Sequence, residues 1–121
     1  MPERFRAVKE YRSPYPNPIR FAEGEEVTVG SVFDDEPAWP DWIWVENRNG
    51  KSAWAPRQYL TVSGSAGWFI RCYDARELSV QTGEVVVIDE VVNGFGAAVN
   101  ANGEKGWVPL NYLEPAADEQ E

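Results

Sequence analysis

The sequence predicts an all-β protein built from two similar small units. A closing block at residues 53–60 recurs as residues 106–113, and an upstream block at residues 21–29 recurs as residues 80–88. Both copies keep the same order along the chain, which identifies an internal repeat. Apolar, β-branched and aromatic residues alternate with polar ones, as in half-buried strands, and no stretch has a convincing helical period.

The spacing of the repeat predicts where the units begin and end. The copies are 59 residues apart in the upstream block and 53 apart in the downstream block, so the first copy has a loop six residues longer, around residues 33–41. Small polar residues at 61–66 are typical of a linker. We therefore expect a first barrel, a linker, a second barrel and a disordered acidic tail, at residues 1–62, 63–66, 67–115 and 116–121 respectively.

Turn residues divide the expected strands inside each copy. The alternation of polar and apolar residues at 42–46 and at 51–55 predicts two strands of one hairpin. An Asn-Gly dipeptide lies between them at residues 49–50 and recurs at residues 102–103. This dipeptide accepts the positive φ of a tight hairpin, so we expect one such hairpin in each unit.

The chain is acidic, with 11 Lys and Arg residues against 20 Asp and Glu residues and a net charge of -9. Residues 1–62 contribute -2 and residues 63–121 contribute -7. Such a chain repels phosphate backbones and anionic lipid. We therefore expect no nucleic-acid or membrane partner, and basic partners are favoured.

The composition argues against catalysis. Because the chain has no histidine, general-base chemistry at neutral pH would need a shifted carboxylate or lysine. The single cysteine, Cys72, has no zinc-type companions, so neither a metal nor another cofactor is expected. The glycine-rich stretch at residues 93–96 lacks the following helix of a phosphate loop and predicts a turn. With no signal-peptide core at the start, a cytoplasmic protein is expected.

A closing Trp-x-Pro-x-x-Tyr motif follows the hairpin in each half, and the combination resembles the Src-homology-3 (SH3) family. In the first half the matching segments are Ala-Val-Lys-Glu-Tyr at 7–11, Gly24-Glu25, Asp41-Trp42 and Ala-Trp-Ala-Pro-Arg-Gln-Tyr at 53–59. In the second half they are Glu-Leu-Ser-Val at 77–80, Gly83-Glu84 and Gly-Trp-Val-Pro-Leu-Asn-Tyr at 106–112. The resemblance implies two tandem SH3-like small β-barrels joined by a short linker.

The closing motif also predicts which side chains face outward. Residues two apart share a face of a strand, so Trp54 and Pro56 point one way and Ala55 points the other. Ala55 and its counterpart Val108 are core candidates, while Trp54 and Trp107 stand on the outer face. A groove walled by such aromatics would accept the prolines of a polyproline II peptide, whose preformed shape lowers the entropy lost on binding.

By the resemblance, each half carries one peptide-binding groove. Trp42 lies 14 residues before Pro56, and Phe95 lies 14 before Pro109, so Phe95 replaces the family's tryptophan. Lys9 stands where the family has its first tyrosine. The first groove is expected to contain Tyr11, Asp41, Trp42, Trp54, Pro56 and Tyr59. The second is expected to contain Tyr73, Glu77, Phe95, Trp107, Pro109 and Tyr112. Tyr73 fits either tyrosine of the family's opening motif.

The resemblance implies a non-enzymatic, monomeric adaptor or targeting module for proline-rich segments of other proteins, with acids such as Asp41 available to a basic peptide end. Two alternatives stay open. Tudor-like barrels bind methylated lysine in aromatic cages, and Tyr11, Tyr15, Trp42 and Asp41 could make one. Residues 13–18 form a polyproline-like segment that could fill a groove and make the chain a structural or self-regulating domain.

Overall fold

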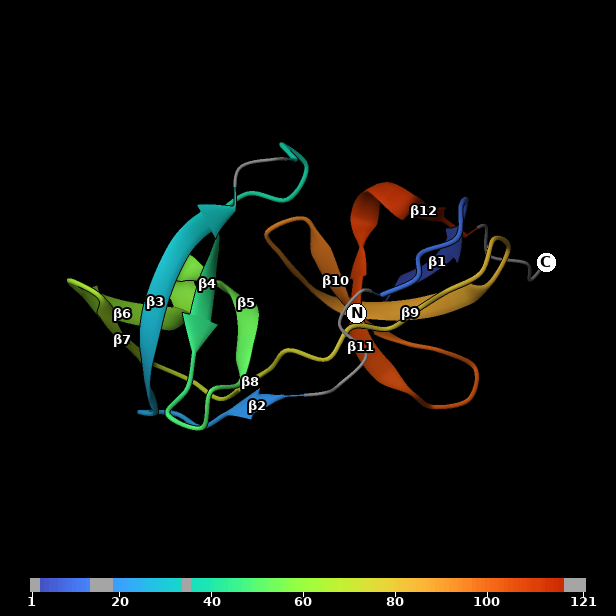
Figure 1. Cartoon of the computed structure of the whole chain (residues 1–121). Helices are drawn as coiled ribbons and strands as arrows, with labels where there is room; N and C mark the ends of the chain where they lie inside the picture. The colour runs from blue at the N-terminus through green and yellow to red at the C-terminus, as the bar shows by residue number, and fades with distance from the viewer. Residues whose placement is uncertain (1–2, 14–18, 34–35, 117–121) are drawn as a thin grey trace. The chain divides into compact units, whose positions relative to one another are not determined.

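The computed structural model describes residues 3–13, 19–33 and 36–116 (Figure 1). Strands dominate these ranges, and two single 3₁₀ turns, η1 (Arg57–Tyr59) and η2 (Leu110–Tyr112), complete the regular structure there. No helix in these ranges is long and apolar enough to cross a membrane. The strands are β1 (Glu3–Ala7), β2 (Arg20–Phe21), β3 (Glu26–Phe33), β4 (Trp42–Glu46), β5 (Ser52–Pro56), β6 (Leu60–Ser63), β7 (Ala66–Phe69), β8 (Tyr73–Asp74), β9 (Val85–Val92), β10 (Phe95–Val99), β11 (Lys105–Pro109) and β12 (Leu113–Pro115).

The strands assemble into two compact units, which confirms the predicted all-β, SH3-like class. Unit 1 contains Met1–Pro16 and Glu77–Glu121, and unit 2 contains Asn17–Arg76. The five-stranded sheet of unit 1 has the order β11-β10-β9-β1-β12, and that of unit 2 has the order β5-β4-β3-β7-β6. Within the described ranges the end strands of each sheet do not pair with each other, so the sheets are open and the expected closed barrels are not formed.

The compact units do not follow the expected boundaries of 1–62 and 67–115, because the two repeats exchange their first strands. In unit 2, β7 of the second repeat lies between β3 and β6 of the first repeat, with Gly67 opposite Val27. In unit 1, β1 of the first repeat lies between β9 and β12 of the second, with Phe5 opposite Val86. Figure 1 shows blue β1 running beside β9 and β12, from the other end of the colour scale.

The expected linker at 63–66 is a hairpin turn. Ser63 pairs with Ala66 across β6 and β7, so only Gly64 and Ser65 lie between the two strands. Gly64 has a φ of 62°, which suits the first central position of a type II′ turn and which glycine adopts without steric cost. Because this turn is so short, β7 continues directly from β6 into the sheet of the first repeat. The place that β7 would have taken in the second repeat is then filled by β1.

Equivalent residues make the same pairings in the two units. Tyr11 forms an antiparallel bridge with Val80 in unit 1, and Tyr73 pairs with Phe21 in unit 2. Val80 and Phe21 occupy the same position of the repeat. The pairing therefore settles the register of Tyr73, which corresponds to Tyr11. The first strand of each repeat therefore packs into the other repeat, in the position that the other repeat's own first strand would otherwise occupy.

The core follows the predicted alternation along the closing strands. Ala55 and Val108 have no exposed surface, as expected for inward-facing residues. Val45 on β4 is equally buried, and its partner Ala53 lies on the same face of β5 as Ala55. Trp54 lies on the opposite face and pairs with Trp44 of β4. The outward orientation that the sequence predicts for the tryptophan of the closing motif is therefore confirmed in unit 2.

The two Asn-Gly hairpins form, but an earlier asparagine organises each turn. Among the residues of the first turn, Gly50 has a positive φ, 81°, and Asn49 does not. The side-chain Oδ1 of Asn47 accepts hydrogen bonds of 3.0 Å from the amides of Asn49 and Lys51. Asn100 plays the same part in unit 1, with two bonds of 3.0 Å. Each hairpin is therefore held by an asparagine side chain that mimics a backbone turn.

The loop that joins β9 to β10 in unit 1 and the equivalent loop that joins β3 to β4 in unit 2 differ in length as predicted. In unit 1, Asn93 and Gly94 alone join β9 to β10, and both have positive φ, 50° and 86°, as a type I′ turn requires. In unit 2, the eight residues 34–41 join β3 to β4. The difference of six residues confirms the longer loop of the first repeat. Within the glycine-rich stretch at 93–96, Asn93 and Gly94 form the predicted turn, and Phe95 and Gly96 begin β10.

Disulfide trapping tests the exchange of first strands. Arg4 and Val87 are opposite one another in β1 and β9, and both are exposed. In a Cys72→Ser background, the pair Arg4→Cys and Val87→Cys should oxidise to an intramolecular disulfide, because opposed antiparallel residues lie within disulfide range. Non-reducing electrophoresis and mass spectrometry detect the bond.

The matched control pairs the same cysteine with the equivalent position of its own repeat. Thr28 is exposed and occupies the place in the first repeat that Val87 occupies in the second. Arg4→Cys with Thr28→Cys should remain reduced under the same conditions. Disulfide formation in this control, with none in the first pair, would mean that β1 stays with its own repeat.

Candidate functional site

Each unit packs two tyrosines edge to face beside its closing 3₁₀ turn. In unit 1 the ring centroids of Tyr11 and Tyr112 are 5.2 Å apart at an interplanar angle of 83°. In unit 2 those of Tyr59 and Tyr73 are 5.6 Å apart at 85°. The two pairs are equivalent, and each takes one tyrosine from each repeat. Tyrosine packing at the candidate site is therefore a direct product of the strand exchange.

This packing corrects the composition of both expected grooves. Tyr11, assigned to the first groove, lies in unit 1, and Tyr73, assigned to the second groove, lies in unit 2. The remaining expected residues of the first groove, which all lie in unit 2, are Asp41, Trp42, Trp54, Pro56 and Tyr59. Those of the second groove, which all lie in unit 1, are Glu77, Phe95, Trp107, Pro109 and Tyr112. Sequence spacing alone could not reveal the swap, because the two tyrosines have equivalent local surroundings.

An aromatic cluster covers part of the outer surface of unit 2. The ring of Trp54 lies 5.0 Å from that of Trp44 and 5.3 Å from that of Phe33, both in edge-to-face packing. The ring of Trp39, in the long loop, stacks on Phe33 at 6.1 Å. All four side chains are partly exposed. We call Phe33, Trp39, Trp44 and Trp54 the aromatic face.

Sequence reasoning found only Trp54 among the residues of the aromatic face. A usable signal for Trp44 was present, because Trp44 follows Trp42 by two residues and so shares its side of β4. The pairing of Trp44 with Trp54 and of Trp42 with Pro56 confirms that these four residues share one side of the hairpin. Phe33 gave no comparable signal because the register of β3 shifts between Val29 and Val32, and Trp39 gave none because it lies in the long loop.

The residues of unit 2 that were expected to form the first groove differ in how far they are buried. Trp42 is 6% exposed and Tyr59 is 5% exposed, and Pro56 is fully buried. Trp54 keeps part of its ring at the surface. Trp42, Pro56 and Tyr59 therefore pack beneath the surface of the site. Among the expected aromatic residues of unit 2, Trp54 is the one that offers ring surface to a ligand.

A hollow of about 480 Å³ is lined in unit 2 by Asp41, Arg57 and Gln58. Asp41 ends the long loop with a φ of 63°, and its carbonyl accepts a hydrogen bond of 2.9 Å from the amide of Arg57. The loop is thereby tied to the start of η1. Both an acidic and a basic side chain line this hollow, so it can accept polar groups of either charge.

The corresponding side of unit 1 offers less aromatic surface. Phe95 pairs with Pro109, and Trp107 pairs with Ala97. Phe95 is 6% exposed and Trp107 is 9% exposed, so the expected outward-facing ring of Trp107 is mostly covered. Ala97 stands where unit 2 has Trp44, and a two-residue turn replaces the long loop. Unit 1 therefore lacks most of the features that make up the aromatic face.

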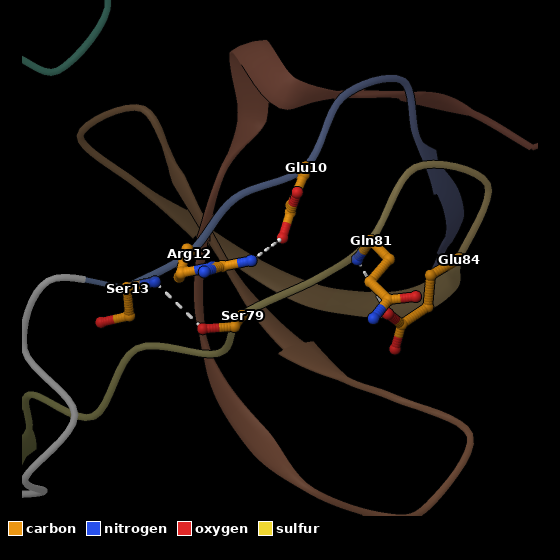
Figure 2. A network of polar contacts seen from close by, with 6 residues as sticks. All are labelled: Glu10, Arg12, Ser13, Ser79, Gln81 and Glu84. Carbon is orange, nitrogen blue, oxygen red and sulfur yellow. Dashed lines mark hydrogen bonds and ion pairs between the residues drawn. The ribbon is translucent and has the colours of Figure 1, made fainter.

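Polar contacts join the two chain segments that meet in unit 1 (Figure 2). The amide of Ser13 donates a hydrogen bond of 3.0 Å to the Oγ of Ser79. Nearby, Arg12 forms an ion pair of 2.9 Å with Glu10. A cavity of about 330 Å³ in this region is lined by Glu10, Tyr11, Arg12, Ser79, Val80, Gln81, Glu84, Asn100, Asn102 and Glu104. This second hollow is mostly polar, and Trp107 of β11 is not among these lining residues.

Glu77 is the acidic residue that was expected in the second groove. It accepts hydrogen bonds where the segment around Tyr11 meets the segment around Ser79. Its Oε1 accepts hydrogen bonds from the hydroxyls of Tyr11 at 2.6 Å and Ser13 at 3.0 Å. Burial raises the pKa of Glu77 above its ordinary value of 4.5, and the two hydrogen bonds oppose that rise. Glu77 thus anchors the exchanged segment.

A cation covers the closing tyrosine in each unit. The Nζ of Lys9 lies 4.4 Å from the ring centroid of Tyr112, and the Cζ of Arg71 lies 4.4 Å from that of Tyr59. Each cation precedes the paired tyrosine, Tyr11 or Tyr73, by two residues. Arg71 therefore occupies in unit 2 the position that Lys9 occupies in unit 1.

Comparison with known families agrees with this geometry. The sequence model described as the variant SH3 domain matches the chain twice, at residues 4–69 and 69–116. The chain belongs to the variant SH3 domain family. The two matches follow one another along the sequence, whereas the strands of each SH3-like unit come from both matches. A search of curated protein sequences finds no match.

SH3 domains generally mediate protein–protein interactions by binding proline-rich peptides, and they are typically non-catalytic. In this SH3 protein, the closing motifs and the paired tyrosines occupy equivalent positions in both units. The aromatic face and the hollow beside Asp41 are found only in the described part of unit 2. The candidate functional site is therefore the outer surface of the β4–β5 hairpin, with the long loop and η1.

The pH dependence of stability tests the buried state of Glu77. Because the folded-state pKa is raised, the folded protein holds more protons than the unfolded chain between pH 4.5 and that raised pKa. The contribution of Glu77 to the free energy of unfolding is therefore most favourable at low pH, where the carboxyl is protonated, and it falls as the pH rises through this window. Glu77→Gln keeps the accepting Oε1 without the charge, so its stability relative to the wild type should increase with pH.

Urea unfolding at a series of pH values between 4 and 8 measures this difference. Glu114→Gln, at an exposed glutamate of the same unit, is the matched control and should show a smaller pH-dependent difference. A difference for Glu77→Gln that is the same at every pH would contradict the effect of burial on the carboxylate.

Proposed function

We propose that the protein binds extended, proline-rich segments of other proteins through the aromatic face of unit 2. The observation that carries the proposal is the partly exposed Trp54, which stands on the side of β5 that also holds Pro56 of the closing motif. Flat aromatic rings are good contacts for proline, and a polyproline II segment loses little conformational entropy on binding. Family membership supports the same function.

Unit 2 is the favoured binding unit within this proposal. Its long loop brings Trp39 against Phe33, and β4 adds Trp44 beside Trp54. Unit 1 has Ala97 in place of Trp44 and a two-residue turn in place of the loop. A ligand of unit 1 would therefore have less aromatic surface to contact, and we expect unit 1 to bind more weakly.

Charge near the hollow of unit 2 suggests the polarity of the ligand. Asp41 is exposed and lines the hollow, so a basic residue next to the prolines would find a carboxylate there. Such an exposed contact is worth about 1 kcal/mol or less and would tune affinity without dominating it. We further expect a non-enzymatic monomer that acts in the cytoplasm, with neither nucleic acid nor membrane as a partner.

The two alternative functions have less support. The proposed methyl-lysine cage needs Tyr11 together with Trp42, and these residues belong to different units. The fourth member of that cage, Tyr15, lies outside the described residues. So does most of the polyproline-like segment at 13–18, of which only Ser13 is described. Neither alternative therefore has a site built from described residues, as the aromatic face is.

An NMR titration of the full chain tests the proposal. A proline-rich peptide library should shift the indole signal of Trp54 and neighbouring amides of β4 and β5. Trp54→Ala should weaken binding about tenfold, because a central aromatic contact commonly carries that much affinity. The same peptides with alanine in place of proline should bind far more weakly.

Trp68→Ala is the matched control for loss of a tryptophan. Trp68 is 37% exposed and lies on β7, which two strands separate from β5 in the same sheet. This variant should bind within about twofold of the wild type. Equal effects of the two substitutions, or shifts caused only by trimethyl-lysine peptides, would overturn the proposal.

A further inference from the structure

The same cation–ring stack is built twice from different residues. A lysine in unit 1 and an arginine in unit 2 lie at the same 4.4 Å from the ring centroid of the closing tyrosine. The tyrosine that packs edge-on against that ring also recurs, at 5.2 Å in one unit and 5.6 Å in the other. Equivalent positions of the two repeats keep a positive charge over the ring with different side chains, which indicates that the charge matters more than the particular residue.

Backbone hydrogen bonds hold the chain next to each cation against the closing tyrosine. The amide of Val8 donates to the carbonyl of Tyr112 at 2.8 Å, and the amide of Ile70 donates to that of Tyr59 at 2.9 Å. Each donor is the immediate neighbour of a cation, Lys9 or Arg71. The backbone next to each cation is therefore hydrogen-bonded to the tyrosine that the cation covers, which keeps the cation's attachment point beside the ring.

A ligand that reaches the closing tyrosine of unit 2 meets Arg71 first. The tyrosine, Tyr59, is only 5% exposed, whereas Arg71 is exposed and lies over the ring. A proline placed here would cover a guanidinium with apolar atoms, which is unfavourable for a charged group. A carboxylate would instead match the planar donors of arginine.

We propose that unit 2 selects proline-rich peptides that carry one acidic side chain, which binds Arg71 beside Tyr59. This inference rests on the proposed peptide-binding function and adds the chemistry of the ligand. The net charge of unit 2 explains why a single acid is selected. Residues 17–76 contain six Lys and Arg against nine Asp and Glu, a balance of -3, so a strongly acidic peptide would be repelled over longer distances.

Lys9 gives the corresponding preference to unit 1. Its ammonium is a point charge with three donors, whereas the guanidinium of Arg71 presents a planar fork. We therefore expect the stronger preference for a carboxylate in unit 2. Glu10, the acid next to Lys9 in sequence, is engaged with Arg12 at 2.9 Å.

The test compares two sets of proline-rich peptides against the full chain. One set carries a single Glu at successive non-proline positions, and the other carries Gln at the same positions. Fluorescence anisotropy should show that the wild type binds the best Glu peptide about fivefold more tightly than its Gln partner at low salt, the upper range for an exposed charge pair. The preference should decrease as salt is added.

Variants at Arg71 assign the effect to one residue. Arg71→Met should abolish the preference for Glu while the Gln peptide still binds. Arg48→Met removes the same charge from an exposed position in the β4–β5 turn and should keep the preference. NMR spectra of both variants verify folding, and Arg71→Lys, which keeps the charge, should retain part of the preference.

The outcomes separate this inference from the function on which it rests. Equal binding of Glu and Gln peptides by the wild type would overturn the acidic preference and leave proline recognition in place. An equal loss of preference in Arg71→Met and Arg48→Met would also overturn it, because net charge would then be the cause. Failure of every peptide to bind would overturn both proposals.

Discussion

The rest of the molecule depends on the two-residue turn at Gly64 and Ser65. This turn joins β6 to β7 as a hairpin, so the first strand of the second repeat enters the sheet of the first repeat. A strand position in the second repeat is then open, and β1 fills it through pairing with β9 and β12. Glycine at the first turn position makes this geometry accessible, because φ is 62° there. One short turn therefore decides which strands share each core.

Local features could be predicted from sequence, and the exchange could not. The inward positions of Ala55 and Val108 and the longer loop of the first repeat depend on alternation and spacing inside one copy. The partner of Tyr11 or Tyr73 depends on which homologous strand lies nearby, and the repeat makes both choices look alike. The available signal was Gly64, but its small polar neighbours have the composition of a flexible linker. A hairpin turn differs from a flexible linker in the backbone pairing of the strands on either side, and amino-acid composition does not reveal that pairing.

Facing outward is also different from being exposed, and this separates the predicted site from the observed surface. Period-two alternation places Trp42 and Trp54 on outward-facing sides of adjacent strands, yet Trp42 is buried and Trp54 is partly exposed. The exposure of an outward-facing side chain depends on which loop residues pack over the sheet, and the loop sequences have no periodic pattern that would predict this packing. The aromatic partners of Trp54, from β3 and the long loop, could therefore be found only in three dimensions. Sequence identifies the side of the sheet, and loop packing decides how much of that side a ligand can reach.

The exchange makes each candidate binding surface the joint product of two repeats. In unit 2, Trp54 and Tyr59 come from the first repeat, while Arg71 and Tyr73 come from the second. A fragment that ends at residue 62 keeps the tryptophan and loses the cation, the paired tyrosine and β7. Such a fragment could pair its own β1 in place of β7, but Lys9 would then replace Arg71 over Tyr59. The surface would change in chemistry even if the fold survived, so ligand preference belongs to the intact pair of repeats.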